Sequence, residues 1–346
     1  MPVVSHPNLP SLERLESSEL VFKEDDSMNE SFSRHLHIGF LNLMPDAAFQ
    51  ATERQFVSML ASDDELLVHL YPTSVAADER GNELKNYIDE HYNHIKDIQK
   101  RKYDGFIISG ANPSQQDMTK ETFWNPLIEV FEWAEENTNS VLCSCLATHA
   151  IMKAKYGIER QMRNEKAWGI FKHDIGKVSH HLIQGLVDGF DGPHSHYYDF
   201  PINEIESTDL EILATNDFAG MYLASSKDGS LVLFQGHPEY GGNSLLKEYQ
   251  REINNFVSGS RADYPPLPKN YFSGSKIEKI EELKKSLLFR VNYFSGAKKF
   301  KIKIKKIDQL LKPKHITLNE SLISDIDLNW QSAGKIIYRN WLNSLV

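Results

Sequence analysis

The segment SVLCSCLATHAIMKAKYG, residues 140–157, is the stretch that decides the fold of this chain. Its first part is a short apolar run, as expected of a buried strand. Its second part has a helical pattern that stops at Gly157, a residue typical of helix ends. Cys145 lies at the junction of the two, where a sharp turn exposes the side chain and the start of the helix favours a thiolate. The segment therefore predicts a reactive cysteine where a buried strand meets a helix.

Similar apolar runs alternate with helical patterns along much of the chain. Strands are predicted at residues 35–45, 65–72, 103–113 and 140–145, and again in LEILATN, MYLASSK and SLVLFQGHPEY. Because buried strands that alternate with amphipathic helices form parallel sheets, the sequence predicts an α/β fold with a doubly wound, mainly parallel sheet.

Composition suggests the domain boundaries. Residues 1–34 are polar and interrupted by prolines, so we expect an irregular N-terminal arm. Residues 35–258 carry the predicted sheet and form the catalytic domain. A proline- and glycine-rich stretch at 261–275 marks a boundary, and residues 259–346 are predicted to be a C-terminal extension that packs on the core. Within it, the alternating lysines of 298–306 predict a half-buried edge strand that resists sheet-to-sheet association.

The overall composition is that of a soluble globular protein. The chain has 346 residues, 40% of them hydrophobic and 25% charged, and a formal net charge of -10. This charge argues against a protein whose whole surface binds nucleic acid. We find no signal peptide and no run of about eighteen apolar residues. The sequence therefore predicts a cytoplasmic protein that acts on small molecules, with no membrane and no nucleic-acid partner.

The two cysteines of the chain are expected to have different roles. Cys143 and Cys145 are too close in sequence for an ordinary structural disulfide. Cys143 still lies inside the apolar run, so we expect it to be buried packing, whereas Cys145 is the candidate nucleophile. His149, one helical turn after Cys145, should point away from the active turn or into packing.

A base for the cysteine is predicted in FQGHPEYGG. A strand ends at Gly236 and delivers His237 and Glu239, whose separation by one residue lets both face one side of an extended backbone. An imidazole beside a carboxylate is the base and orienting group that a thiol nucleophile needs. Two more histidines, His194 and His196, are expected in a loop, but no carboxylate or cysteine pattern completes a metal site, so no metal is predicted.

Eight motifs in order resemble the homoserine O-acyltransferase family, of the homoserine transsuccinylase type. The likeness covers about residues 35–258 and returns at 340–346. The motifs are LNLMP, DGFIISGA, the cysteine turn with YGI after it, EKAWG, PHSHYYDFP, GHPEY, LLKEYQRE and NWLNSLV. This resemblance implies the class I glutamine amidotransferase-like, flavodoxin-like fold, an acyl-coenzyme A co-substrate, no tightly bound cofactor, and a role in methionine biosynthesis.

The resemblance also implies roles for particular residues. It implies a triad in which Cys145 forms an acyl-thioester, His237 accepts the proton and Glu239 is its partner. It implies substrate contacts from Lys166, Ser195 and Arg251. An arginine suits the carboxylate of an amino acid, and a lysine and a serine are donors for an anionic or carbonyl oxygen. The backbone N–H groups near Ala111 and Leu146 are expected to hold the oxyanion.

The sequence departs from the family pattern in four places. The paired lysines that often follow LNLMP are absent, Leu146 stands where tryptophan is usual after the cysteine, and His196 replaces the arginine of PHSR. Ser114 occupies the position linked to donor choice, where glycine goes with succinyl and glutamate with acetyl. A small neutral side chain there leaves room for succinyl, so we favour succinyl-CoA over acetyl-CoA.

The expected reaction is acyl transfer to the hydroxyl of L-homoserine by a ping-pong mechanism. L-Serine as acceptor, a glutamine amidotransferase-like hydrolase and a binding module without catalysis remain as alternatives. The C-terminal segment leaves a homodimer open.

Overall fold

The structure is a computed structural model that describes residues 3–16, 32, 34–63, 65–75, 80–299, 316–324 and 328–345, with the side chains of 290–299 left out. The predicted edge strand at 298–306 lies outside the described residues except for the backbone of its first two. Among the described residues, no helix combines the length and the apolar character needed to span a membrane.

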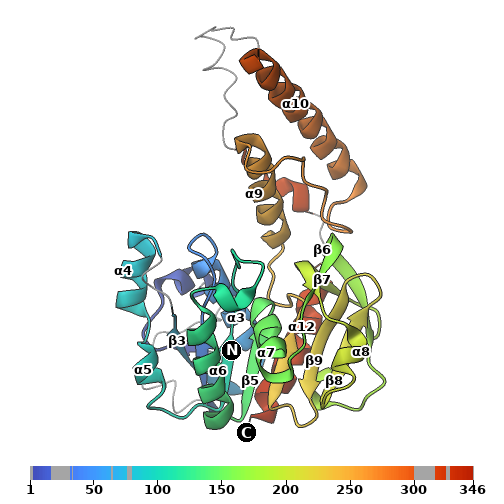
Figure 1. The fold of residues 1–346 in the computed structure, drawn as a ribbon. Coiled ribbons are helices and arrows are strands. Elements are labelled where there is room, and N and C mark those ends of the chain that lie inside the picture. Colours follow the sequence, from blue (N-terminus) through green and yellow to red (C-terminus); the bar gives the residue numbers. More distant parts are fainter. Residues whose placement is uncertain are drawn as a thin grey trace. The chain divides into compact units, whose positions relative to one another are not determined.

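One sheet of ten strands forms the centre of the fold (Figure 1). The strand order is β1-β3-β2-β4-β5-β10-β9-β8-β6-β7. The strands are β1 Val3–Ser5, β2 Arg34–Leu41, β3 Leu66–Thr73, β4 Gly105–Ile108, β5 Ser140–Ser144, β6 Gln161–Ile175, β7 Phe190–Asp199, β8 Leu210–Asn216, β9 Gly220–Ser226 and β10 Leu231–Phe234.

Helices connect and cover these strands. The α-helices are α1 Glu13–Glu16, α3 Phe49–Leu60, α4 Asn82–His91, α5 Ile95–Ile98, α6 Trp124–Asn137, α7 Leu146–Tyr156, α8 Ile202–Ile205, α9 Ser244–Ser258, α10 Gly274–Lys299 and α12 Asn329–Ser344. The short 3-10 helices are η1 Pro10–Leu12, η3 Met118–Lys120, η4 His181–Ile183 and η5 Glu320–Ile323.

The sheet has a parallel half and a second half joined by antiparallel pairs. Strands β1, β3, β2, β4, β5 and β10 pair in parallel. Strand β9 is antiparallel to β10 and to β8, and β6 is antiparallel to β8. The predicted α/β fold with a mainly parallel sheet is therefore confirmed, with an additional antiparallel region.

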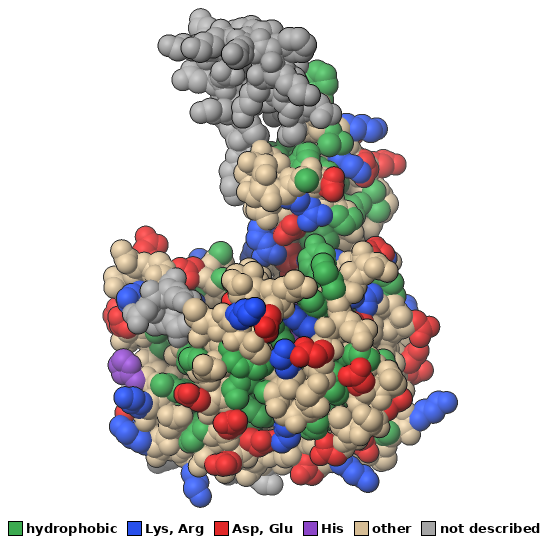
Figure 2. All heavy atoms as spheres, viewed as in Figure 1, with side chains coloured by type: hydrophobic (Ala, Val, Ile, Leu, Met, Phe, Trp, Pro, Cys, Tyr) green, Lys and Arg blue, Asp and Glu red, His purple; other side chains and the backbone are tan. Residues whose placement is uncertain are grey.

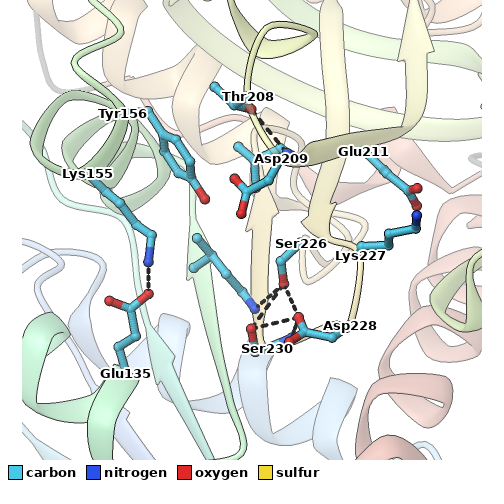
Figure 3. Close-up of a pocket in the computed structure, with 12 residues that line it drawn as sticks. Glu135, Lys155, Tyr156, Thr208, Asp209, Glu211, Ser226, Lys227, Asp228 and Ser230 are labelled. Atoms are coloured by element: carbon cyan, nitrogen blue, oxygen red, sulfur yellow. Dashed lines mark hydrogen bonds and ion pairs between the residues drawn. The ribbon is translucent and has the colours of Figure 1, made fainter.

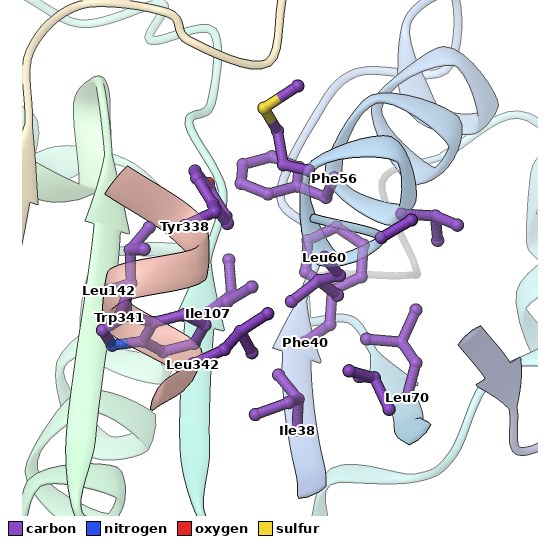
Figure 4. Close-up of a cluster of buried hydrophobic side chains, with 14 of the residues drawn as sticks. Ile38, Phe40, Phe56, Leu60, Leu70, Ile107, Leu142, Tyr338, Trp341 and Leu342 are labelled. Atoms are coloured by element: carbon purple, nitrogen blue, oxygen red, sulfur yellow. The ribbon is translucent and has the colours of Figure 1, made fainter. Parts of the chain in front are cut away.

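Both faces of the parallel half are buried because successive side chains of a strand point to opposite faces. Ile107 and Leu142 face one hydrophobic core, and their neighbours Ile108 and Cys143 face the other. The first core includes side chains of α3 and α12, and Figure 4 shows Tyr338, Trp341 and Leu342 of α12 among them. The second core includes side chains of α6 and α7. The sheet is thus covered on both faces.

The N-terminal segment differs from the irregular arm that was expected. Residues Val3–Ser5 form β1, an edge strand that pairs in parallel with β3. A three-residue strand is too short to give a recognisable pattern in the sequence, but Val3 and Val4 are buried. The segment is therefore an integral part of the sheet.

The chain divides into two compact units. The first comprises residues 1–167, 171–239 and 329–346, and contains the sheet and α12. The second comprises residues 168–170 and 240–328, with α9, α10 and η5. These units do not follow the predicted boundaries, because the apolar side of α12 packs in the first core while the proline-rich segment pairs with residues 168–170 through Gly169 and Lys269.

Candidate active site

Cys145 occupies a strained turn between β5 and α7. Its φ of 50° and ψ of -107° lie outside the regions that ordinary residues prefer. The backbone N–H of Cys145 donates to Phe234 O of β10 at 2.7 Å, which holds the turn in place. A Cβ on Gly110 would lie 3.3 Å from Cys145 Cβ, which is a tight contact, so a glycine there favours the close approach of the loop after β4. The turn leaves Cys145 partly exposed, as its sequence position predicts.

His237 follows β10 and lies beside the cysteine. Its Nδ1 is 2.8 Å from Glu239 Oε1, and its side chain is hydrogen-bonded to that of Cys145. Burial opposes a positive charge on His237, but the Glu239 carboxylate and the Cys145 sulfur together raise the pKa of His237 well above its usual value. The backbone N–H of His237 donates to Pro193 O of β7 at 2.9 Å. The structure therefore brings the three predicted triad residues together.

The surroundings of Glu239 are apolar and aromatic. Tyr222 and Tyr338 are fully buried, and burial, followed by the charge of Glu239, raises the pKa of both phenols. Both tyrosines therefore stay neutral beside the carboxylate. A Cβ on Gly334 of α12 would lie 2.9 Å from Pro238 Cβ, so the helix touches the turn that carries His237 and Glu239.

A chain of three buried imidazoles lies behind this turn. His173 Nε2 is 2.9 Å from His194 Nε2, His194 Nδ1 is 3.0 Å from His196 Nε2, and His196 Nδ1 is 2.7 Å from Tyr198 O. Burial lowers the pKa of His173 to about 4 and that of His196 to about 3, and it lowers the pKa of His194 well below its usual value. All three rings are therefore neutral near pH 7.

The carbonyl of Tyr198 fixes the proton positions in this chain. Because a carbonyl only accepts, His196 Nδ1 carries the hydrogen and His196 Nε2 accepts one from His194 Nδ1. His194 Nε2 then accepts from His173 Nε2. The loop predicted around Ser195 is instead part of strand β7. The glycine and proline near its start suggest a turn in the sequence, but both lie within the strand, which the hydrogen-bonded histidines support.

The predicted substrate residues have different settings. Ser195 lies on β7 between two buried histidines. Lys166 lies on β6 with Nζ 5.5 Å from the centre of the Tyr197 ring. Arg251 belongs to the second unit, on α9, where its Nε lies 3.5 Å from Glu252 Oε1 and its side chain is 60% exposed. Lys166 and Ser195 thus share the sheet unit with the triad, and the role of Arg251 stays a prediction.

The loop after β4 contains the predicted donor-specific residue. The backbone N–H of Ser114 donates to Glu121 Oε1, and its hydroxyl donates to Glu121 Oε2 at 3.2 Å. Gln115 N donates to the same carboxylate. The carboxylate of Glu121 therefore closes residues 112–121, which we call the donor loop.

The predicted oxyanion donors lie on two backbone segments that approach each other. Leu146 is the first residue of α7, and such residues have an N–H without a partner inside the helix. A Cβ on Gly110 would lie 3.7 Å from Leu146 N, so the segment that leads to Ala111 is adjacent. This arrangement suits an anionic oxygen near Cys145.

Two residues near Cys145 are buried, as predicted for them. Cys143 is completely buried in the second core, and burial raises the pKa of its thiol far above the usual range. His149 is 3% exposed and stacks on Phe200, with ring centres 4.3 Å apart. Burial also lowers the pKa of His149 well below its usual value, so its ring is neutral.

Sequence reasoning missed Arg160 and His173. Arg160 interacts electrostatically with Cys145 from the loop that follows α7. Nothing in YGIER distinguishes this arginine from a surface charge. His173 gave no signal because the strand that carries it, β6, was not predicted.

A separate pocket of about 540 Å³ lies at the opposite edge of the parallel strands (Figure 3). It lies at the end of α7 and the start of β10, and no predicted site residue lines it. Two of its groups are already paired, because Lys155 contacts Glu135 and Asp228 accepts from Ser226 and Ser230.

On the face shown in Figure 2, acidic and basic side chains of the first unit are intermingled.

Comparison with known proteins shows the family to which this chain is related. The model of the family described as homoserine O-succinyltransferase matches residues 2–346. A homoserine O-succinyltransferase of Nitrosococcus oceani is 38% identical over 349 aligned residues, which cover 100% of this chain and 92% of that protein. A homoserine O-succinyltransferase of Methylobacter tundripaludum is 39% identical, and the alignment covers 100% of this chain and 93% of that protein.

A solved structure shows the same fold. A glutamine amido transferase of Methylobacillus flagellatus is similar with a TM-score of 0.50 and 14% sequence identity, and the match covers 90% of this chain and 96% of that one. This likeness concerns the fold alone.

Proposed function

Since this chain belongs to the homoserine O-succinyltransferase family and is a succinyltransferase, we propose that it transfers succinyl from succinyl-coenzyme A to the hydroxyl of L-homoserine. The proposed role is methionine biosynthesis in the cytoplasm. The observation that carries the proposal is the strained Cys145 beside the buried pair of His237 and Glu239. Such a cysteine is a nucleophile, and its base is already oriented.

The first half of the proposed reaction forms an acyl-enzyme. The Cys145 thiolate attacks the thioester carbonyl of succinyl-CoA, and the N–H groups of Leu146 and Ala111 stabilise the oxyanion. When the carbon–sulfur bond to coenzyme A breaks, the departing thiolate takes the proton from the His237 imidazolium. A succinyl group is then attached to Cys145 Sγ, and His237 is neutral.

The second half passes the succinyl group to the acceptor. His237 removes the proton from the homoserine hydroxyl as the oxygen attacks the acyl carbon, and the Cys145 thiolate leaves. Glu239 holds His237 Nδ1, which keeps Nε2 available as the base and stabilises the imidazolium that forms. Lys166, Ser195 and Arg251 are proposed to bind substrate oxygens during this step.

The proposal is tested by trapping the intermediate. The protein is incubated with succinyl-CoA without acceptor, free coenzyme A is followed with a thiol-reactive dye, and the adduct is mapped by mass spectrometry. We expect a burst and an adduct on Cys145, no adduct in Cys145→Ala, and an unchanged adduct in the matched control Cys143→Ala. An adduct that persists in Cys145→Ala contradicts the assignment.

Adding acceptors separates the alternatives. Loss of the adduct with L-homoserine and formation of O-succinylhomoserine support the proposal. A faster reaction with L-serine would identify serine as the acceptor. A faster burst with acetyl-CoA would identify acetyl-CoA as the donor. Ammonia release from glutamine without any use of acyl-CoA indicates a glutaminase instead.

A further inference from the structure

Arg160 is held in a fixed position next to the nucleophile. Its guanidinium carbon lies 3.9 Å from the centre of the Tyr198 ring of β7. Its Nη2 donates to Gln116 O of the donor loop at 3.1 Å. Stacking and a hydrogen bond together orient the planar group between β7 and that loop. The guanidinium is therefore preorganised, not a freely moving surface charge.

This guanidinium has no carboxylate partner in the part of the chain that the structure describes. No described Asp or Glu oxygen forms an ion pair with Arg160. Its sequence neighbour Glu159 is paired with Lys153 at 2.7 Å, and Glu121 is occupied by the backbone of Ser114 and Gln115. The charge of a half-buried arginine is normally balanced by an anion. Arg160 therefore has N–H donors available for an anion from outside the chain.

Arg160 also lies within electrostatic range of the cysteine. Arg160 interacts electrostatically with the Cys145 sulfur and with His149, on the next turn of α7. Glu121, which closes the donor loop, is also within electrostatic range. The position is thus bounded by the nucleophile and by the loop predicted to choose the donor.

We propose that Arg160 binds the terminal carboxylate of the succinyl group and selects succinyl over acetyl donors. The proposal rests on the proposed function, because it places the acyl carbon on Cys145. Succinyl differs from acetyl by a methylene group and a carboxylate, so its charge lies two methylene groups beyond the carbonyl carbon. A guanidinium recognises a carboxylate with two parallel hydrogen bonds.

Ser114 acts on the same charge in this proposal. Its hydroxyl and N–H bind the Glu121 carboxylate, which lies within electrostatic range of Arg160. A glutamate at position 114 adds a second carboxylate to this part of the loop. That carboxylate competes with succinyl for the arginine, whereas serine leaves the arginine to the substrate.

The first test compares donors in Arg160→Gln. We expect the rate of Cys145 acylation by succinyl-CoA to fall about 10- to 100-fold, because one charged hydrogen-bond pair is lost. Acylation by acetyl-CoA should change less than about threefold. Arg160→Lys should recover part of the succinyl rate, because a lysine keeps the charge but not the bidentate geometry. Arg101→Gln is the matched control, since Arg101 also lies over a tyrosine ring, that of Tyr71.

A shortened donor distinguishes the acyl carboxylate from the phosphates of coenzyme A. The S-succinyl and S-acetyl thioesters of N-acetylcysteamine lack all phosphates. If Arg160 binds the acyl group, Arg160→Gln lowers the succinyl rate selectively with these donors too. An equal loss for both acyl groups, or a loss seen only with the coenzyme A thioesters, overturns the proposal and assigns Arg160 to cysteine positioning or to coenzyme A.

Two further outcomes separate this proposal from the proposed function. If Ser114→Glu and Arg160→Gln act on one interaction, the double variant loses no more succinyl specificity than the stronger single variant, whereas additive losses contradict the proposal. A normal adduct on Cys145 without any donor discrimination in the unchanged protein defeats only the role of Arg160. Absence of any acyl adduct defeats the triad and Arg160 together.

Discussion

The two halves of the sheet present their functional groups in different ways. In the parallel half, Gly110, Cys145 and His237 all follow the carboxyl ends of strands, in loops at one edge. In the other half, Lys166 and Ser195 lie within strands β6 and β7. Loops at the edge of a parallel sheet suit reacting groups, because several strand ends converge there. Residues inside a strand have fixed backbones and suit the positioning of a substrate or of a neighbouring loop.

Hydrogen bonds connect the two halves of the sheet next to His237. Pro193 O of β7 accepts from His237 N, and Tyr198 O of β7 accepts from Gln235 Nε2 at 3.0 Å. The second half thus supports the end of β10 and the backbone of His237. The comparison predicts that changes in the parallel half affect both half-reactions, whereas changes in the other half affect transfer or stability.

The largest effect is expected for His237→Asn. Acylation of Cys145 and transfer to homoserine should both slow by roughly two to four powers of ten, because each step moves a proton through this imidazole. Glu239→Gln should cost less, since the carboxylate orients the ring but does not transfer the proton. The measurements are the burst of coenzyme A and single-turnover transfer, with the exposed His94→Gln as control. An unchanged burst in folded His237→Asn would show that His237 does not act as the base in acylation.

A smaller effect is expected for Lys166→Gln on β6. Transfer of succinyl from Cys145 to homoserine should slow about tenfold, whereas the burst of coenzyme A should stay within about a factor of two, if this lysine binds an oxygen of the acceptor. Lys172→Gln is the matched control, because Lys172 lies on the same strand but is 76% exposed and pairs with Asp191 at 3.6 Å. Equal slowing of the burst and of transfer would show that Lys166 affects both half-reactions, as expected for residues of the parallel half.

The smallest effect concerns stability and pH. The folded-state pKa of His196 is about 3, below the usual 6.5, so the unfolded chain binds a proton more readily as the pH falls. The stabilisation by neutral His196 is fully present above about pH 6.5 and is lost as the pH falls toward 3. Urea unfolding of His196→Gln between pH 5 and 7 should therefore depend on pH less steeply than that of the unchanged protein, by about 1 kcal/mol per pH unit.

The control for this prediction is His94→Gln, which changes an exposed histidine. Its unfolding free energy should follow the pH dependence of the unchanged protein. If His196→Gln has the same slope as that protein, the imidazole chain is not what makes the second half of the sheet sensitive to acid.

The parallel half was the more predictable from sequence. Its strands are short and buried on both faces, so they appear as apolar runs, and the position of Cys145 at the end of one such run predicts its exposure. The long strand β6 was missed because its first six residues are polar or partly exposed. Strand β7 was missed because Gly192 and Pro193 are turn signals that here lie inside a strand.

The candidate site was predictable only in part for a similar reason. Cys145, His237 and Glu239 have local sequence signals, since each follows a recognisable strand. The position of Arg160 depends on Tyr198 and on Gln116, which are distant in sequence and meet it only in the folded chain. No local sequence pattern predicts contacts between residues so far apart in the chain. The same holds for His173 on β6, whose ring contacts that of His194 on the neighbouring strand β7.

Helix α12 follows the other described elements of the sheet unit in the sequence. Its Gly334 touches Pro238 between the base and its carboxylate, and its Trp341 Nε1 donates to Ser140 Oγ at the start of β5 at 2.9 Å. The strands that precede Cys145 and His237 are made before this helix, and domains generally fold as units during synthesis. The turn that carries His237 and Glu239 is therefore fully supported only when α12 has packed against it.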